Sequence, residues 1–244
     1  MHKPKFLFIL LLSLMATIST AQEIFIGGFQ DVAPYILKIR ENGKPDIITG
    51  GIIKEITDEV TFRTGLTFTY FYPPRKRLDL EIAQGNLHII PMGNPAWFSK
   101  PELFLWSSPI FKEKLEFLTL KSFKGNITGF SHLEGLKIGM SEGFVYQAFP
   151  TNFNFYREDA ATVARNIKRL KEGWIDALYG EELDILYHLK ENADLFIVHP
   201  WSPSTSVYSW AVSKSLGENG IRIVSTIETM IADGTIDRIL AKYR

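Results

Sequence analysis

The sequence contains no cysteine, and this absence excludes several kinds of site at once. Disulfide bonds, cysteine-ligated zinc, iron–sulfur clusters and thiol nucleophiles all need a residue that the chain lacks. The chain also has no excess of either charge, because 27 Lys and Arg balance 27 Asp and Glu among its 244 residues. Nucleic-acid-binding proteins carry a marked basic surface, so we expect no nucleic-acid partner.

Apolar and charged residues are present in the proportions of an ordinary packed protein. Hydrophobic residues make up 45% of the chain and charged residues 22%, which excludes a disordered or collagen-like chain. The histidines are scattered, and no two of them are three or four residues apart, as ligands on one helix face would be. We therefore expect neither a metal ion nor a cofactor. The five histidines are His2, His88, His132, His188 and His199.

The first 21 residues have the pattern of a secretory signal peptide. Lys3 and Lys5 precede an apolar run over residues 6–12, and small residues up to Ala21 supply a cleavage site. A retained membrane anchor is the alternative, but the apolar stretch is short for a spanning helix. Without cysteine there is no residue for a lipid at the cleavage site. We predict a free periplasmic protein that begins near residue 22.

Each half of the remaining chain shows a β-loop-α-β pattern. A short apolar strand ending in glycine occurs at residues 23–28 (EIFIGG) and again at residues 136–143 (LKIGMSEG). Later in each half, a helix ends in glycine and a strand follows at once. These pieces are residues 85–93 (GNLHIIPMG) and 173–180 (GWIDALYG), whose first glycines are expected in the left-handed conformation.

Three apolar stripes at helical spacing predict amphipathic helices. Strands that alternate with such helices predict parallel sheets, in which ligands bind beyond the carboxyl ends of the strands. The stripes are Ile52, Ile53, Ile56 and Val60 before Gly65; Val163, Ile167, Leu170 and Trp174; and Ile223, Ile227, Met230 and Ile231.

Over the whole predicted mature chain, the sequence resembles the bacterial periplasmic solute-binding proteins of family 3, which serve amino-acid ABC transporters. The order and spacing of the pieces carry the resemblance. They are IFIGG (24–28), Ala33-Pro34-Tyr35, Gly50-Gly51, YPPRKR (72–77), FLWSSPIF (104–111), LEGLKIGMSEG (133–143), GWIDAL (173–178) and DGTIDRILAKY (233–243).

The resemblance implies an α/β fold of the type II periplasmic binding protein kind. In that fold two lobes, each a mostly parallel sheet flanked by helices, are joined by two hinge strands and close on a small ligand. We expect lobe 1 to comprise residues 22–112 plus 206–244 and lobe 2 residues 113–205. The crossings are expected near residues 112–115 and 201–206. The implied function is capture of a small polar, amino-acid-like ligand by a monomer that serves an ABC permease or a membrane sensor.

The sequence departs from the family pattern where the ligand α-carboxylate is held. Family members use an arginine three positions after a threonine, and Lys100 and Trp97 stand there instead. A lysine supplies charge but not a planar, two-pronged donor. Glu181 aligns with the acidic residue that holds the α-amino group in the family. We expect a ligand other than a standard free amino acid, or one that is held differently.

The predicted ligand shell is aromatic with a few charges, as small-molecule pockets commonly are. Aromatic rings stack on ligands or cover cations, basic residues hold anionic groups and acidic residues hold cationic ones. Backbone N–H groups near Ser141 also suit an anion or a carbonyl. The predicted ligand-binding residues are Phe29, Asp31, Tyr35, Tyr72, Arg77, Asn94, Trp97, Lys100, Ser141, Glu142, Phe144, Tyr146 and Glu181.

One motif favours an enzyme instead. Residues 139–143 (GMSEG) form a G-x-S-x-G pattern after a strand, as in the nucleophile elbow of hydrolases. Asp176 or Asp184 followed by His188 or His199 would complete a catalytic triad in the required order. A dehydratase on the same fold is a further alternative. Because the pattern is short and the repeat explains the same stretch, we predict a binding protein without catalytic residues.

Overall fold

The structure is a computed structural model that describes residues 23–28, 32–39, 46–73, 77–144, 146, 148–149, 154–190 and 193–244. The predicted signal peptide and two predicted ligand-binding residues, Phe29 and Asp31, lie outside this part of the chain. Within it, no helix has the length and apolarity needed to cross a membrane.

Short strands and helices alternate along the chain, as the sequence predicts. In chain order they are β1 (Ile24–Ile26), β2 (Leu37–Ile39), β3 (Ile47–Gly50), α1 (Ile52–Thr64), β4 (Phe68–Tyr70), α2 (Leu78–Ala83), β5 (Ile89–Gly93), β6 (Phe104–Trp106), β7 (Phe111–Leu120), β8 (Lys137–Ser141), β9 (Tyr156–Ala160), α3 (Val163–Lys171), β10 (Ala177–Glu181), α4 (Glu182–Leu189), β11 (Phe196–Ser213), α5 (Glu218–Ala232) and α6 (Thr235–Leu240).

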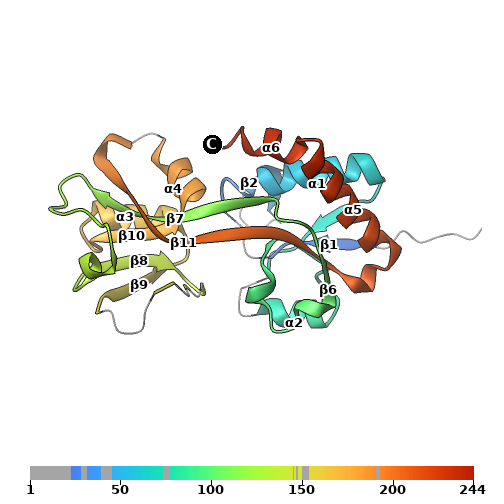
Figure 1. Cartoon of the computed structure of the whole chain (residues 1–244), viewed down its shortest axis with the longest axis horizontal. Coiled ribbons are helices and arrows are strands. Elements are labelled where there is room, and N and C mark those ends of the chain that lie inside the picture. The colour runs from blue at the N-terminus through green and yellow to red at the C-terminus, as the bar shows by residue number, and fades with distance from the viewer. Residues whose placement is uncertain are drawn as a thin grey trace, which may run out of the picture.

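The elements form two groups that are joined by two long strands (Figure 1). In one group β4, β1 and β5 are parallel neighbours, and in the other β10, β8 and β9 are parallel neighbours. Between them β11 pairs antiparallel with β5 and β7, and β7 pairs antiparallel with β10. Each lobe thus has a parallel core bordered by an antiparallel crossing strand.

The two long strands β7 and β11 pair with each other, and the paired residues include those for which the sequence analysis predicts the crossings. Ser204 lies opposite Leu115, Thr205 opposite Lys114 and Ser206 opposite Glu113. The ladder shifts register between His199 and Ser204, so the strands are irregular at one place between the lobes. A β-bulge of this kind increases local twist and bends the strand.

Helices α1, α5 and α6 pack together over the lobe 1 sheet, and α3 and α4 cover the lobe 2 sheet. The predicted stripes supply the lobe 1 core, in which Ile56, Val60, Ile223 and Ile227 are at most 1% exposed. Burying a large apolar side chain contributes roughly 1.5–3 kcal/mol, so these helices are held mainly by packing. Trp174 was expected in the lobe 2 stripe, but α3 ends at Lys171 and Trp174 is 63% exposed.

Glycines end helices as predicted, and a glycine at the end of β1 has a different structural reason. Gly65, Gly85 and Gly173 each have φ of +73°, the left-handed conformation that ends a helix at little cost in glycine. At Gly27 the reason is close approach, because a Cβ would lie 1.7 Å from the carbonyl oxygen of Phe71. Glycine is therefore required where β1 leaves the sheet.

Candidate functional site

Polar and aromatic side chains meet where the crossing strand β7 lies beside the start of α4. Tyr35 comes from lobe 1, is fully buried and donates its hydroxyl hydrogen to Glu113 Oε2 at 2.7 Å. Glu113 lies on β7 and is 3% exposed. Its other carboxylate oxygen, Oε1, accepts a hydrogen bond from the backbone N–H of Leu183 at 2.7 Å. Both oxygens of one buried carboxyl group are thus used, on opposite sides.

Two more buried carboxyl groups lie next to Glu113. Glu181 ends β10 and immediately precedes α4, and Asp184 lies in the first turn of that helix. Each is 4% exposed. Asp184 Oδ1 lies 3.3 Å from His188 Nε2, although it accepts no hydrogen bond of good geometry. We call Glu113, Glu181 and Asp184 the junction acids.

Two of the junction acids, Glu113 and Asp184, hold protons more tightly than ordinary carboxyl groups. Burial, reinforced by the charge of Glu181, raises the pKa of Glu113 to about 8, although hydrogen bonds from Tyr35 and Leu183 oppose this shift. Burial, reinforced by the charges of Glu181 and Glu113, raises the pKa of Asp184 to about 8. Burial also lowers the pKa of His188, so this histidine supplies little positive charge at neutral pH. A cationic group brought among the junction acids would favour their ionised forms.

Three tyrosines surround the junction acids. Burial first, and then the charges of Glu113 and Glu181, raise the pKa values of Tyr35 and Tyr208 well above their ordinary value. Burial and the charge of Glu181 also raise the pKa of Tyr146. The rings of Tyr208 and Phe111 are 4.9 Å apart between centroids, which places Tyr208 over the start of β7. Neutral phenol rings around carboxylates are suited to an organic cation.

In lobe 2 an arginine that the sequence analysis did not single out holds the loop after β8. Arg157 donates to the Phe144 carbonyl oxygen at 2.9 Å, and its guanidinium carbon lies 5.5 Å from the Tyr146 ring centroid. The Tyr146 hydroxyl oxygen accepts from the Ser141 backbone N–H at 3.2 Å. The predicted ligand-binding residues Ser141, Phe144 and Tyr146 are therefore brought together, with Tyr146 facing Glu181.

In lobe 1 three predicted residues lie against the core or the crossing strand. Asn94 donates to the Val207 carbonyl oxygen at 3.1 Å, and the Trp97 ring meets the Tyr208 ring edge-on at 5.8 Å. Tyr72 packs against the lobe 1 core. The structure thus links Asn94 and Trp97 to the crossing strand β11 beside the junction acids.

The predicted charged residues Arg77, Lys100 and Glu142 are exposed. Arg77 forms an ion pair with Glu81 one helical turn away, and Glu81 also accepts from Asn86 at 2.9 Å. Lys100 precedes a short 3-10 helix at Pro101–Leu103. Within the described part of the chain, no hydrogen bond or ion pair joins any of the three to Glu113 or Asp184. The carboxylate-binding role predicted for Arg77 and Lys100 gains no support from these positions.

Glu113 and Asp184 are the residues that sequence reasoning missed. In β7 the side chains of Phe111, Glu113 and Leu115 alternate with exposed lysines, so the two-residue period already placed Glu113 on the buried face. Asp184 lies in the first turn of α4, where an acid is usually solvated, although its neighbours Leu183 and Ile185 are buried. The signal was present for Glu113 and weak for Asp184.

The hydrolase motif does not assemble with either candidate histidine. His199 accepts a hydrogen bond from the Ile127 backbone N–H at 3.1 Å and lies 2.9 Å from Thr119 Oγ1. His188 faces Asp184, and Asp176 accepts from the Lys137 backbone N–H at 2.8 Å. The side chain of Ser141 lies beside Tyr146 instead. Among the described residues, no three His, Asp or Glu side chains are arranged to hold a metal ion.

Comparison with solved structures shows which known proteins share this architecture. A substrate-binding protein of an amino acid ABC transporter aligns with a TM-score of 0.72 at 17% identity, over 91% of this chain and 99% of the other. The chain has the fold of amino-acid substrate-binding proteins. The two-lobed α/β prediction is thereby confirmed.

Two further structures place known ligands on this substrate-binding fold. AbpA from Streptococcus pneumoniae, bound to L-arginine, aligns with a TM-score of 0.72 at 18% identity over 91% of this chain and 94% of its own. The GluR0 ligand-binding core in complex with L-glutamate aligns with a TM-score of 0.76 at 14% identity, over 92% and 99%. No family model and no curated protein matches the sequence. At these identities the likeness establishes the fold, while ligand and partner require their own argument.

Proposed function

We propose that the chain is a periplasmic solute-binding protein that captures a small polar ligand between its lobes by hinged closure and delivers it to an ABC permease. The observation that carries the proposal is the pair of crossing strands with buried polar side chains at their junction, on a fold that amino-acid substrate-binding proteins share. A ligand that prefers the closed state shifts the protein towards it. No covalent step is required of the protein, which we propose acts as a monomer.

We propose the division into lobe 1, residues 22–112 plus 206–244, and lobe 2, residues 113–205. The pairing of Ser206 with Glu113 supports these limits, because both proposed boundaries then lie on one rung of the ladder. The predicted signal peptide would carry the protein to the periplasm. Intact mass of protein recovered from the periplasm of a bacterial host tests this step, and a chain that begins at Gln22 is expected.

The chemistry at the junction favours a ligand with a cationic group. Carboxyl groups of Glu113, Glu181 and Asp184 and the rings of Tyr35, Tyr146 and Tyr208 suit an ammonium or guanidinium group. The ligand α-carboxylate has no arginine at the position that family members use, since Lys100 stands there and is exposed. We therefore propose a cationic small molecule, held mainly through its positive end. Two structures that share this fold contain bound amino acids, L-arginine and L-glutamate, so amino acids, and basic ones in particular, are included in the binding test.

Thermal unfolding of the exported protein tests binding directly. The panel contains basic, neutral and acidic amino acids, polyamines, small peptides, organic acids and sugars. A ligand at a hundred times its dissociation constant adds about 2.7 kcal/mol to the free energy of unfolding, which moves the midpoint by a few degrees. We expect cationic compounds to raise the midpoint and to be recovered unchanged. Preferential stabilisation by organic acids, or consumption of a compound that Ser141→Ala abolishes, would contradict the proposal.

Delivery to a permease is tested in the source cells. Deletion of the gene is expected to abolish high-affinity uptake of the compound that stabilises the protein, measured with a radiolabelled sample. Uptake that is unchanged, together with a lost transcriptional response to the compound, would identify a sensor partner instead. Tight stereospecific binding of a common L-amino acid in calorimetry would contradict the unusual mode of carboxylate recognition.

A further inference from the structure

Helix α4 begins without a cap of its own. Glu181 occupies its N-cap position but makes no side-chain capping bond. The first backbone N–H groups of a helix have no partner inside the helix and favour a nearby negative charge. For Leu183 that partner is the carboxylate of Glu113, which reaches across from β7. The start of α4 is therefore capped by a residue of the crossing strand.

A second contact ties the same turn to lobe 1. The side chain of Leu183 is 4% exposed and belongs to the same buried cluster as Tyr35, Ile110, Phe111 and Tyr208. The body of α4 packs instead on β7, β10 and α3 in lobe 2. The first turn of α4 thus lies where lobe 2 meets the lobe 1 core.

Glu113 joins these contacts through its two oxygen atoms. Oε1 holds the α4 turn and Oε2 holds the hydroxyl of Tyr35. Resting on the proposed ligand-binding function, we propose that Glu113 is a positioning residue that fixes Tyr35 and the first turn of α4 relative to each other. The orientation of the lobes is then set from the crossing strand, before any ligand arrives. The Tyr35 hydroxyl donates to Glu113, and its ring packs in the lobe 1 core.

The charge around Glu113 determines what the variants should show. The titratable groups that act on it are Tyr35 and Tyr208 from lobe 1 and the crossing strand, and Glu181, Glu182 and Asp184 from lobe 2. Asp184 in turn faces His188. Glu113→Gln keeps an acceptor for Leu183 and offers an N–H to the Tyr35 oxygen. Glu113→Leu keeps the approximate volume and removes both bonds.

Hydrogen exchange of single backbone amides in the full exported protein tests the capping contact. In Glu113→Leu we expect the Leu183 amide to exchange roughly tenfold faster or more relative to the Ile138 amide in β8, because the buried N–H of Leu183 loses its hydrogen-bond acceptor. In Glu113→Gln the same ratio should stay within about threefold of the wild type. Equal acceleration of Leu183 and Ile138, which indicates general destabilisation, would overturn the proposal, as would an unchanged ratio.

Glu116 provides a matched control on the same strand. It is 8% exposed, burial and the charge of Glu182 raise its pKa, and it lies opposite Gly180 in the ladder. Its side chain points to the opposite face of β7 from that of Glu113, and it forms no hydrogen bond with Leu183 or Tyr35. Glu116→Leu should leave the ratio of Leu183 to Ile138 exchange unchanged. If it accelerates Leu183 as much as Glu113→Leu does, the effect is not specific to Glu113 and the proposal is wrong.

The lobe 1 side is tested with Tyr35→Phe, which removes one hydroxyl and is expected to fold even if Glu113→Leu does not. The chain has no cysteine, so Asp79→Cys on α2 and Arg165→Cys on α3 accept spin labels at two exposed positions. We expect a broader distance distribution between the labels in Tyr35→Phe, with the Leu183 amide still protected. An unchanged distribution would overturn the role of Glu113 in setting lobe orientation.

These measurements are made without ligand, so the two proposals fail separately. A thermal panel in which no compound binds would count against the proposed function and leave the exchange and distance results standing. Unchanged exchange and distances, together with a clear ligand, would overturn only the positioning role of Glu113.

Discussion

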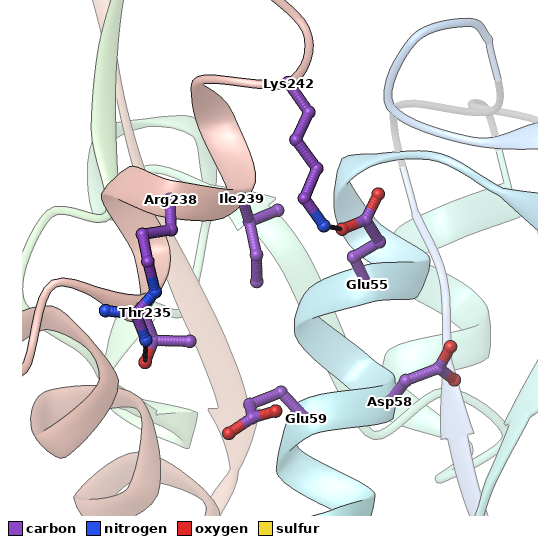
Figure 2. A pocket seen from close by; sticks show the side chains of 7 residues that line it. All are labelled: Glu55, Asp58, Glu59, Thr235, Arg238, Ile239 and Lys242. Carbon is purple, nitrogen blue, oxygen red and sulfur yellow. Dashed lines mark hydrogen bonds and ion pairs between the residues drawn. The ribbon is translucent and has the colours of Figure 1, made fainter.

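Acidic side chains gather at two places, on the outside of lobe 1 and at the junction of the lobes, and the pKa of Glu55 at the first is shifted in the opposite direction from those of Glu113 and Asp184 at the second. The outer group lies on α1 and lines a groove of about 470 Å³ against α6 (Figure 2). Hydrogen bonds from Lys242 and Tyr243 outweigh the partial burial of Glu55 and lower its pKa. At the junction, burial and mutual repulsion raise pKa values instead. The outer group is Glu55, Asp58 and Glu59, and the inner group is Glu113, Glu181 and Asp184.

The difference comes from the partners and not from the residue type. Asp58 pairs with Lys54 at 2.6 Å, and Glu59 pairs with Arg63 at 2.7 Å. Figure 2 shows Lys242 reaching Glu55 across the groove. The charge of a paired acid at the surface is already balanced by a basic side chain of the protein. A cation that binds among crowded buried acids instead lowers their free energy. The comparison favours a structural role for the groove and supports the binding role that we propose for the junction.

The largest expected effect is the pH dependence of stability. Glu113 and Asp184 have folded-state pKa values raised to about 8, above those of the unfolded chain. The folded protein then binds more protons than the unfolded chain between about pH 4.5 and pH 8, so stability falls as pH rises through this window. We expect the unfolding midpoint to drop by several degrees between pH 5 and pH 9. Thermal unfolding at constant ionic strength measures it.

The double variant Glu113→Gln with Asp184→Asn should flatten this slope, because neither group then titrates. Glu55→Gln, which alters the outer group, serves as the control and should leave the slope in place. A slope that persists in the double variant would show that other groups carry the pH dependence.

A smaller effect is expected when one buried carboxyl group is replaced at high pH. Asp184→Asn should raise the free energy of unfolding by about 1–3 kcal/mol at pH 9, since it removes a crowded buried charge. At pH 5, where Asp184 is protonated, the difference should nearly vanish. Urea unfolding at both pH values measures the change. Asp58→Asn in the outer group should stay within about 0.5 kcal/mol at either pH. Equal effects of the two substitutions would remove the contrast between the groups.

The smallest effect is expected in the outer group itself. Glu55→Gln should lower the free energy of unfolding by roughly 0.5–1 kcal/mol at low salt, because Lys242 is 60% exposed and such pairs are screened by solvent. In 1 M salt, where the Debye length is about 3 Å, the loss should shrink. Urea unfolding at two salt concentrations tests this. A loss of unfolding free energy as large as that expected for a buried carboxyl group would show that the Glu55–Lys242 pair is not a solvent-screened surface pair.

Local patterns predicted much of the fold. Helix α1 ends at Gly65 as expected, and parallel strands alternate with helices in both halves of the chain. Period and glycine placement suffice for such features because they depend on neighbours within a few residues. Trp174 was assigned to a buried stripe wrongly, because the helix stops three residues earlier and the spacing rule no longer applies.

The candidate site was harder to predict because it is assembled from distant segments. Tyr35, Tyr146 and Glu181 do lie around the junction, and their role in ligand binding stays a prediction. Glu113 and Asp184 take their properties from side chains that lie far away in sequence, such as Tyr35, 78 residues from Glu113. By contrast, the Arg77–Glu81 pair is spaced for one helical turn and was readable from the sequence.

The sheet order has a consequence for the sequence of events during synthesis. Strand β5 borders β11, and the lobe 1 core is completed by Ile223, Ile227 and Met230 of α5, all at the far end of the chain. In the middle segment β7, β10, β8 and β9 pair with one another, and β7 also pairs with β11, which follows them. The core of lobe 1 therefore cannot be completed until the last residues have been synthesised, whereas the residues that form the lobe 2 core are synthesised earlier. A protein built in this way finishes folding only after its last helix has been synthesised.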